Sequence, residues 1–335
     1  MMDARLAEAK NDQKCALERL TSAEQIAIDT ELYRATGAAP GSVRYFLENY
    51  FVINTKGEDW EEQRLQTVYP FTETQEILWA EILDAHKKQV PFWALLLKAR
   101  QIRWSTIIQG CVFQRTITRK NTKSLTIADE LKRSNEIFNM SLLAYNKLPW
   151  WMRPEKALDN RSEGIIRFDR KNKDEQLINP GLNSAFYVDA ANKPTGSSRG
   201  FTLHNVHATE FGLWQAPKIL TADIIPAVPK KNPMVICVVE GTAKGSGENY
   251  SFMRMWNMAM QGRGLFRPVF AAWWKEKTYC KPFPSSLDQA AFLFTKEEVE
   301  LVAKVEDEFN YTITKEQMHW RREQAEQFAA TDGDA

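Results

Sequence analysis

The sequence of 335 residues lacks several features that would assign it to a specialised class of protein. It contains no apolar run of about 18 residues, the minimum for a membrane-spanning helix, so we expect no transmembrane segment and no membrane partner. Its four cysteines are far apart without a Cys-x-x-Cys pair, which argues against a disulfide framework or a zinc site. Lys and Arg total 44 against 43 Asp and Glu, which excludes a strongly basic nucleic-acid coat for the chain as a whole.

What is present is an ordinary globular composition, with 44% hydrophobic residues and 11 tryptophans, so a substantial core is expected. Short apolar runs at 92–100, 201–210 and 233–241 alternate with helical patterns such as the amphipathic segment 74–88. This alternation predicts βαβ units in an α/β fold, with a mainly parallel central sheet and helices on both faces. Residues 105–145 are expected to form two helical stretches divided by the polar segment 115–124. Residues 2–30 are expected to form a helical arm, and capping boxes at Thr295 and Thr314 each predict a helix start.

The segment 95–106 is the first of three that can carry chemistry. An apolar strand there runs into a polar turn that opens a helix, where backbone N–H groups and the helix dipole can hold a phosphate. Lys98 can neutralise phosphate charge, and the hydroxyl of Ser105 can join a Mg²⁺ shell. The pattern Gly-x₄-Gly-Lys-Ser/Thr is absent, so a strand followed by a solvated basic turn is the alternative interpretation.

The second and third segments also end in polar residues. Glu210 follows the apolar segment 201–209, at the position where a parallel sheet places a general base. His204 and His207, three residues apart, would point to opposite faces of a strand, which favours packed or solvated histidines over zinc ligands. The apolar segment 235–240 enters a loop rich in glycine, which can approach a ligand closely or serve as a plain connection.

Taken together, the three segments resemble the N-terminal ATPase domain of the large terminase subunit of tailed bacteriophages or prophages. The family's phosphate loop, K-x-R-Q-x-G-x-S-T, stands here as residues 98–106, and its L-S-E-x-A-F-W pattern corresponds to residues 208–214. Its E-S-T-A-N-G segment corresponds to residues 240–245, and R-G-x-T to residues 199–202. The resemblance is collinear over residues 43–325 and implies a P-loop NTPase fold of the additional-strand catalytic-glutamate type, with small helical N- and C-terminal additions.

The resemblance further implies a site for ATP and Mg²⁺ at these strand ends. The implied nucleotide-binding residues are Gln75 on the adenine side, Lys98, Arg100, Gln101, Arg103, Trp104, Ser105 and Thr106 in the phosphate loop, and Thr242 and Ala243 near the γ-phosphate. In this interpretation Lys98 and Glu210 are catalytic, Ser105 holds Mg²⁺, and Glu210 positions the attacking water. Arg199 is the candidate arginine finger for a neighbouring subunit's nucleotide, with a solvated loop charge as the alternative.

Three residues depart from the family's pattern. Arg103 replaces the phosphate-loop glycine, so a Cβ strains a turn that glycine adopts freely. Trp104 stands where the ordinary P-loop lysine would be, which leaves that role to Lys98. Thr209 replaces the Asp that often precedes the catalytic glutamate, so Mg²⁺ would depend on Ser105 and water.

The expected organisation is a helical arm at residues 1–42, an ATPase domain at 43–280 and a helical linker or lid segment at 281–335. The family's nuclease domain would follow and is expected to be absent. The resemblance implies an ATP hydrolase that moves double-stranded DNA into a procapsid. Its partners would be the portal protein, the small terminase subunit and further copies in a ring, and its location the host bacterial cytoplasm.

Local charge leaves the DNA-contacting surface open. Residues 98–133 hold nine Lys or Arg against two Asp or Glu, which suits either a DNA backbone or a solvated helix face. Two other function classes also remain. One is a helicase-like ATPase stimulated by nucleic acid and not tied to packaging, and the other is a catalytically weakened nucleotide-binding assembly module.

Overall fold

The computed structural model describes residues 19–54, 65–156, 158–160, 164–168, 170–171, 177–179, 181–192, 200, 202–242 and 250–332. The chain divides into two compact units. The first contains Met1–Phe71 and Gln75–Phe270, and the second contains Thr72–Thr74 and Ala271–Ala335. The predicted boundaries at residues 42 and 280, and the roles given to the segments outside them, remain predictions.

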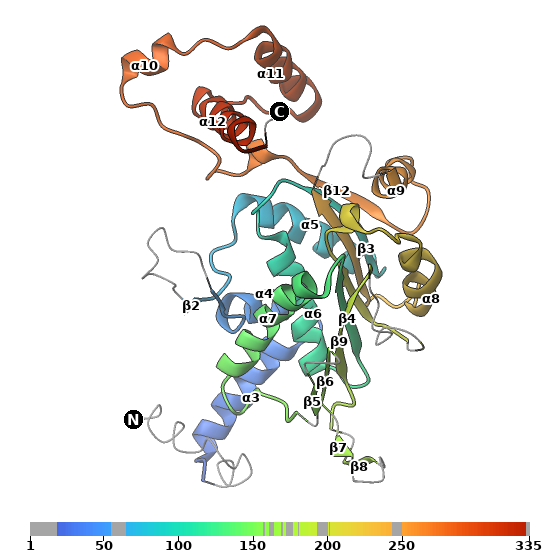
Figure 1. The fold of residues 1–335 in the computed structure, drawn as a ribbon. Helices are drawn as coiled ribbons and strands as arrows, with labels where there is room; N and C mark the ends of the chain where they lie inside the picture. Colours follow the sequence, from blue (N-terminus) through green and yellow to red (C-terminus); the bar gives the residue numbers. More distant parts are fainter. Residues whose placement is uncertain are drawn as a thin grey trace. The chain divides into compact units, whose positions relative to one another are not determined.

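An eight-stranded sheet forms the centre of the first unit, in the order β12-β3-β11-β10-β4-β9-β6-β5 (Figure 1). Five neighbouring strands are parallel, namely β3 (Phe92–Lys98), β11 (Ile236–Thr242), β10 (Asn205–Ala208), β4 (Lys123–Ala128) and β9 (Ala185–Ala190). The remaining strands are β12 (Arg267–Ala271) and the antiparallel β6 (Ile165–Arg167) and β5 (Leu158–Asn160). Two small antiparallel pairs join β1 (Ile53–Asn54) to β2 (Leu65–Gln66) and β7 (Arg170–Lys171) to β8 (Leu177–Asn179).

Helices cover both faces of this sheet (Figure 1). One face carries α6 (Trp104–Thr118) and α7 (Leu131–Lys147), with α3 (Ser22–Thr36), α4 (Pro40–Asn49) and α5 (Glu73–Lys87) beyond them. The other carries a π-helical turn (Leu220–Ile224) that runs into α8 (Ile225–Ala227), and α9 (Tyr250–Met260). Residues Phe92–Leu96 of β3 are all buried, as a strand covered on both faces requires. The predicted α/β class is confirmed, and β11 is the additional strand between β3 and the strand that precedes Glu210.

The prediction for residues 105–145 is wrong in one respect. A central strand, β4, begins at the end of the polar segment between the two helices, and this strand was not expected. Its sequence, KSLTIA, does not show the apolar run of a buried strand, because it contains Ser124 and Thr126. Both of these polar residues are nevertheless fully buried. Ser124 hydrogen-bonds the Thr116 hydroxyl at 2.6 Å, and Thr126 donates to the Gln109 side chain at 3.1 Å. These bonds offset the cost of placing hydroxyls in the core.

The N-terminal helix also differs from its prediction. The helical arm was expected at residues 2–30, whereas α3 begins at Ser22 and runs to Thr36. Thr21 caps it in a capping box with Glu24, which fixes the start of the helix. Residues 1–18 lie outside the described part of the chain.

The second unit is helical, with α10 (Ser286–Ala291), α11 (Lys296–Phe309) and α12 (Lys315–Asp332). Both predicted capping boxes are confirmed. Thr295 exchanges hydrogen bonds with Glu298, and Thr314 exchanges them with Gln317. The core of this unit is small, and its buried hydrophobic residues are Ala272, Trp274, Val305, Ile313 and Met318. Across the described residues of both units, no helix has the length and apolarity that crossing a membrane requires.

Candidate functional site

The carboxyl edge of the parallel sheet brings three of the predicted site residues together. Lys98 is the last residue of β3 and lies opposite Thr242, the last residue of β11, in the strand register. Glu210 follows the end of β10, the next strand along, by two residues. Because parallel strands end at the same edge, the three residues converge as a nucleotide site in an open α/β sheet requires.

The turn between β3 and α6 leaves the start of that helix uncapped. Its N-cap is Arg103, whose side chain makes no capping hydrogen bond. The N-cap side chain thus leaves the first-turn N–H groups of this 15-residue helix unbonded, and the helix dipole adds partial positive charge there, as suits an anion. Arg103 and Gln101 adopt φ of 61° and 60°, in the left-handed region that favours glycine. Arg103 thus has the strained backbone conformation that was expected where it replaces the family's glycine.

The first turn of α6 assigns different environments to the three predicted residues that it carries. Trp104 is fully buried, so its side chain is not available to a phosphate. Thr106 directs its hydroxyl toward the Met140 sulfur, 3.9 Å away on α7. Ser105 is half-buried, and its hydroxyl hydrogen-bonds the neighbouring Glu240 carboxylate. Of the three side chains, Ser105 is the one whose surroundings suit a metal ligand.

Glu240, on β11, is the polar centre of this edge. It is fully buried, and its Oε1 accepts hydrogen bonds from Thr209 Oγ1 at 2.7 Å and His207 Nε2 at 3.1 Å. Its Oε2 lies 3.9 Å from Lys98 Nζ. A buried carboxylate is tolerated only when paired and hydrogen-bonded, and here both conditions are met.

His207 extends the network through the core to α6. Its Nδ1 lies 2.9 Å from Gln109 Oε1, while the Gln109 amide nitrogen donates to Ser141. Both ring nitrogens of His207 therefore lie beside oxygen atoms. His207 and Lys98 thus engage the two oxygens of the Glu240 carboxylate, Oε1 and Oε2 respectively.

Lys98 and His207 control the ionisation of Glu240. Burial by itself raises the pKa of this carboxyl. The charges of Lys98 and His207 and the hydrogen bonds from His207 and Ser105 outweigh burial and hold the pKa below its ordinary value. Glu240 is therefore a carboxylate at neutral pH.

The oxygen atoms at this edge fit Mg²⁺. That ion takes hard oxygen ligands, and Ser105 offers a hydroxyl beside the Glu240 carboxylate. Glu240 Oε2 is buried and accepts no hydrogen bond among the described residues, and its ion-pair partner Lys98 lies 3.9 Å away.

The other predicted residues lie in varied environments. Glu210 is partly exposed with φ of 50°, and no hydrogen bond or ion pair engages its carboxylate among the described residues. Gln75 is 2% exposed near the start of α5, and Arg100 is exposed in the phosphate loop. Arg199 and Ala243 lie outside the described residues, so their roles stay predictions.

Sequence reasoning gave no role to Glu240, and it missed the partnership of Glu240 with His207 and Gln109. A signal was available, because Glu240 ends the apolar run 235–239 and so predicts a buried carboxylate in need of a cation. Which residue supplies that cation depends on the order of the strands in the sheet, which the sequence does not give. His204, the other histidine of the pair, uses Nδ1 to accept from the Lys123 N–H at 3.2 Å at the opposite edge of the sheet.

Solved structures of phage large terminases are similar to this chain. The Thermus phage P74-26 large terminase ATPase domain is 16% identical, with 72% of this chain and 90% of that chain covered and a TM-score of 0.43. The HK97 bacteriophage large terminase is 15% identical, with 82% of this chain and 54% of that chain covered and a TM-score of 0.46. The large terminase of a thermophilic bacteriophage, solved in complex with ADP, is 9% identical over 59% of this chain and 44% of that one, with a TM-score of 0.39. No protein-family model matches the sequence, and the search of curated proteins found no match.

Proposed function

We propose that this chain is an ATP-hydrolysing motor domain that packages viral DNA. The observation that carries the proposal is the convergence of Lys98, Ser105 and Glu210 at the carboxyl edge of a parallel sheet, beside an uncapped helix start. This arrangement supplies positive charge, backbone donors and a free carboxylate within one edge. Phosphoryl transfer depends mainly on such positioning and electrostatic stabilisation.

In the proposed reaction, the first-turn N–H groups of α6 and the Lys98 ammonium hold the terminal phosphates of ATP. Ser105 and Glu240 would hold Mg²⁺, which when bound would supply positive charge to the phosphate oxygens. Glu210 accepts a hydrogen bond from the attacking water and orients it. Its lack of a partner among the described residues leaves the carboxylate free for that water.

The coupling of hydrolysis to movement of double-stranded DNA is the finer part of the proposal. It comes from the sequence motifs, because terminases of this type pack DNA into a procapsid through a portal. We propose the same partners here, together with the small terminase subunit and a ring of copies in the host cytoplasm. Thr242 lies opposite Lys98 in the strand register. In the proposed motor it responds to loss of the γ-phosphate and transmits the change to β11.

The first test is ATP hydrolysis by the purified chain and its Lys98→Ala variant. Removing the ammonium should lower the rate at least about 100-fold and weaken nucleotide binding, because phosphate charge then lacks its main side-chain counterion. Lys88→Ala is the matched control, since Lys88 is an exposed lysine paired with Asp84 on α5, and it should hydrolyse ATP at the parent rate. Parental activity in Lys98→Ala would refute the assignment of the phosphate loop.

The second test separates a packaging motor from the alternatives. Hydrolysis should increase on addition of procapsids that carry a portal, together with double-stranded DNA. Stimulation by nucleic acid alone would instead indicate a helicase-like ATPase. Tight nucleotide binding without turnover, with or without procapsids, would indicate a nucleotide-binding assembly module.

A further inference from the structure

A second polar cavity lies at the amino edge of the same sheet, opposite the carboxyl edge. Its volume is about 250 Å³, and it is bordered by the end of α6, the turn into β4 and the starts of β10 and β11. The polar or basic side chains that line it include Arg115, Arg119, Lys120, Asn121, His204 and Asn205. Among the described residues no carboxylate lines it, although Asp and Glu make up almost half of the charged residues of the chain.

Two arginines at this edge have no counterion in the described part of the chain. Arg115 donates from Nη1 to the Met234 carbonyl, and Arg119 donates from Nη2 to the Thr36 carbonyl at 2.9 Å. In both residues Nε is buried without a hydrogen-bond partner, and among the described residues neither forms an ion pair. A buried cation without an anion is costly, so the pair is incomplete as it stands.

Electrostatics point the same way. Burial lowers the pKa of Arg115 to about 10, and the charge of the neighbouring Arg119 contributes to that decrease. Burial also lowers the pKa of Arg119. Two like charges therefore repel each other in a place that solvent screens poorly, and an anion between them would relieve both effects.

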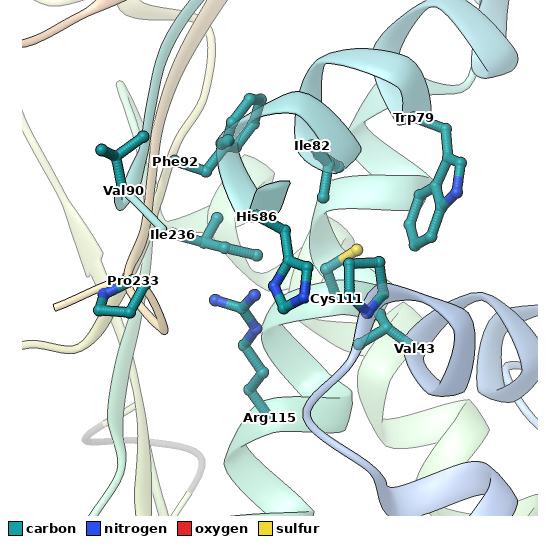
Figure 2. Close-up of a pocket in the computed structure, with 12 residues that line it drawn as sticks. Val43, Trp79, Ile82, His86, Val90, Phe92, Cys111, Arg115, Pro233 and Ile236 are labelled. Carbon is teal, nitrogen blue, oxygen red and sulfur yellow. The ribbon is translucent and has the colours of Figure 1, made fainter. Parts of the chain in front are cut away.

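The surroundings of Arg115 on its other side offer no anion either. Figure 2 shows its guanidinium facing His86 and Ile236 in a small cavity between α5, α6 and the sheet. That cavity has a volume of about 10 Å³, room for about one water, and none of its lining residues in the described part of the chain is a carboxylate. The larger, polar cavity is therefore the one of the two with room for the counterion of Arg115.

Two further side chains offer hydrogen bonds to an occupant. His204 Nδ1 accepts from the Lys123 N–H, so the proton of the neutral ring is on Nε2 and available for donation. Asn205 is 1% exposed, and its Oδ1 is buried without a partner while Nδ2 donates to Ser124. The cavity thus combines cationic donors with one acceptor that needs a hydroxyl.

We propose that this cavity binds a phosphate group, as inorganic phosphate or as the phosphate of a small monoester. Phosphate at neutral pH carries anionic oxygens for Arg115, Arg119 and Lys120, and its P–OH group can donate to Asn205 Oδ1. Sulfate has the same shape and no O–H under these conditions, so phosphate binds more tightly. The site is separate from the nucleotide site, because it lies at the opposite end of the strands and uses none of Lys98, Ser105 or Glu210.

The test is calorimetric titration of inorganic phosphate into the full chain carrying Lys98→Ala, which weakens phosphate binding at the other edge. One equivalent should bind, and adding Arg119→Gln should weaken it about tenfold, since a charge-assisted hydrogen bond is lost. Lys120→Gln, a change at an exposed residue that preserves the fold, should weaken it about threefold. Arg263→Gln, the same change in a different cavity, should have no effect.

Sulfate in place of phosphate should bind several-fold more weakly, and a phosphate monoester such as glycerol phosphate shows whether an organic group is accepted. A crystal soaked in phosphate should show the ion within hydrogen-bond distance of Arg119. Absence of binding at millimolar phosphate would overturn the proposal. Equal affinity in the parent, Arg119→Gln and Lys120→Gln chains would do so as well.

Discussion

At the carboxyl edge of the parallel sheet, the buried carboxylate of Glu240 lies among Lys98, His207 and Thr209. At the amino edge, Arg115 and Arg119 lie at the end of α6 with backbone carbonyls as acceptors and no carboxylate partner among the described residues. Both edges belong to the same strands and the same helix. The difference indicates that the carboxyl edge finds its ion pairing within the chain, in Lys98 and Glu240, whereas the amino edge depends on a charge from outside.

The largest effect expected at the carboxyl edge is on turnover. Glu210→Gln should lower ATP hydrolysis about 10²–10⁴-fold, because the amide cannot accept the proton of the attacking water. Nucleotide affinity should stay near the parent value, measured with a fluorescent ATP analogue beside a phosphate-release assay. Glu130→Gln, at the exposed N-cap of α7, is the matched control and should keep parental turnover. Joint loss of binding and turnover in Glu210→Gln would mean that Glu210 is structural.

The next effect concerns stability at the same edge. Glu240→Gln should lower the free energy of unfolding by about 3 kcal/mol, because it leaves the mostly buried Lys98 ammonium facing a neutral amide. Urea unfolding at pH 7, followed by circular dichroism, measures the change. A loss below about 1 kcal/mol would mean that the network contributes little to the fold.

The same ion pairing predicts how the free energy of unfolding depends on pH. The pKa of Glu240 is held below its ordinary value of 4.5, so the stability gained from its ionised form is complete above that pH. It is lost as the pH falls below 4.5 toward the lowered pKa. Parent protein should therefore lose stability more steeply than Glu240→Gln between pH 5 and pH 3, and parallel curves would contradict the ion pairing.

A smaller effect is expected at the amino edge. Arg115→Met keeps much of the side chain's volume and removes a charge that lacks a counterion, so it should change the free energy of unfolding by less than about 1 kcal/mol. Urea unfolding in phosphate-free buffer, run beside Glu240→Gln, gives the comparison directly. Destabilisation as large as that of Glu240→Gln would show that Arg115 is compensated within the chain and that the two edges do not differ.

The smallest effect is expected in the turn that joins β3 to α6. Arg103→Gly removes the penalty of a Cβ at φ of 61° and adds chain entropy to the unfolded state. These opposing effects should leave stability within about 0.5 kcal/mol, and the ATPase rate should rise or stay level. Thermal unfolding and phosphate release test this, with a severe loss of activity showing that the Arg103 side chain itself contacts phosphate.

The sequence was informative where local chemistry decides the structure. The run Phe92–Leu96 is apolar throughout and predicts a strand buried on both faces, and Thr295 and Thr314 predict helix starts through their own capping bonds. Strand β4 was missed because its polar residues are satisfied by partners distant in sequence, such as Gln109. Local propensity holds no information about those partners.

The candidate site shows the same division. Lys98 and Glu210 could be proposed because each follows an apolar run, and Ser105 because its hydroxyl lies in the polar turn after the first run. Glu240 was not assigned, because its partner Thr209 directly follows β10, and the pairing of β10 with β11 brings the two side chains to 2.7 Å. The basic run 98–133 was expected to face DNA or solvent, whereas Arg115 and Arg119 turn their Nε atoms into the interior. The composition of a segment gives its charge, but it does not tell in which direction the charged side chains point once the helix has formed.

The separation of 3.9 Å between Lys98 Nζ and Glu240 Oε2 has a consequence for ligand affinity. In the proposed motor, an incoming phosphate meets a lysine that already has an anionic neighbour, so binding is an exchange of one partner for another. The affinity measured in solution is then the difference between two ion pairs, and it is lower than an unpaired lysine would give. On departure of the product phosphate, Lys98 returns to Glu240, which favours release and readies the site for the next nucleotide.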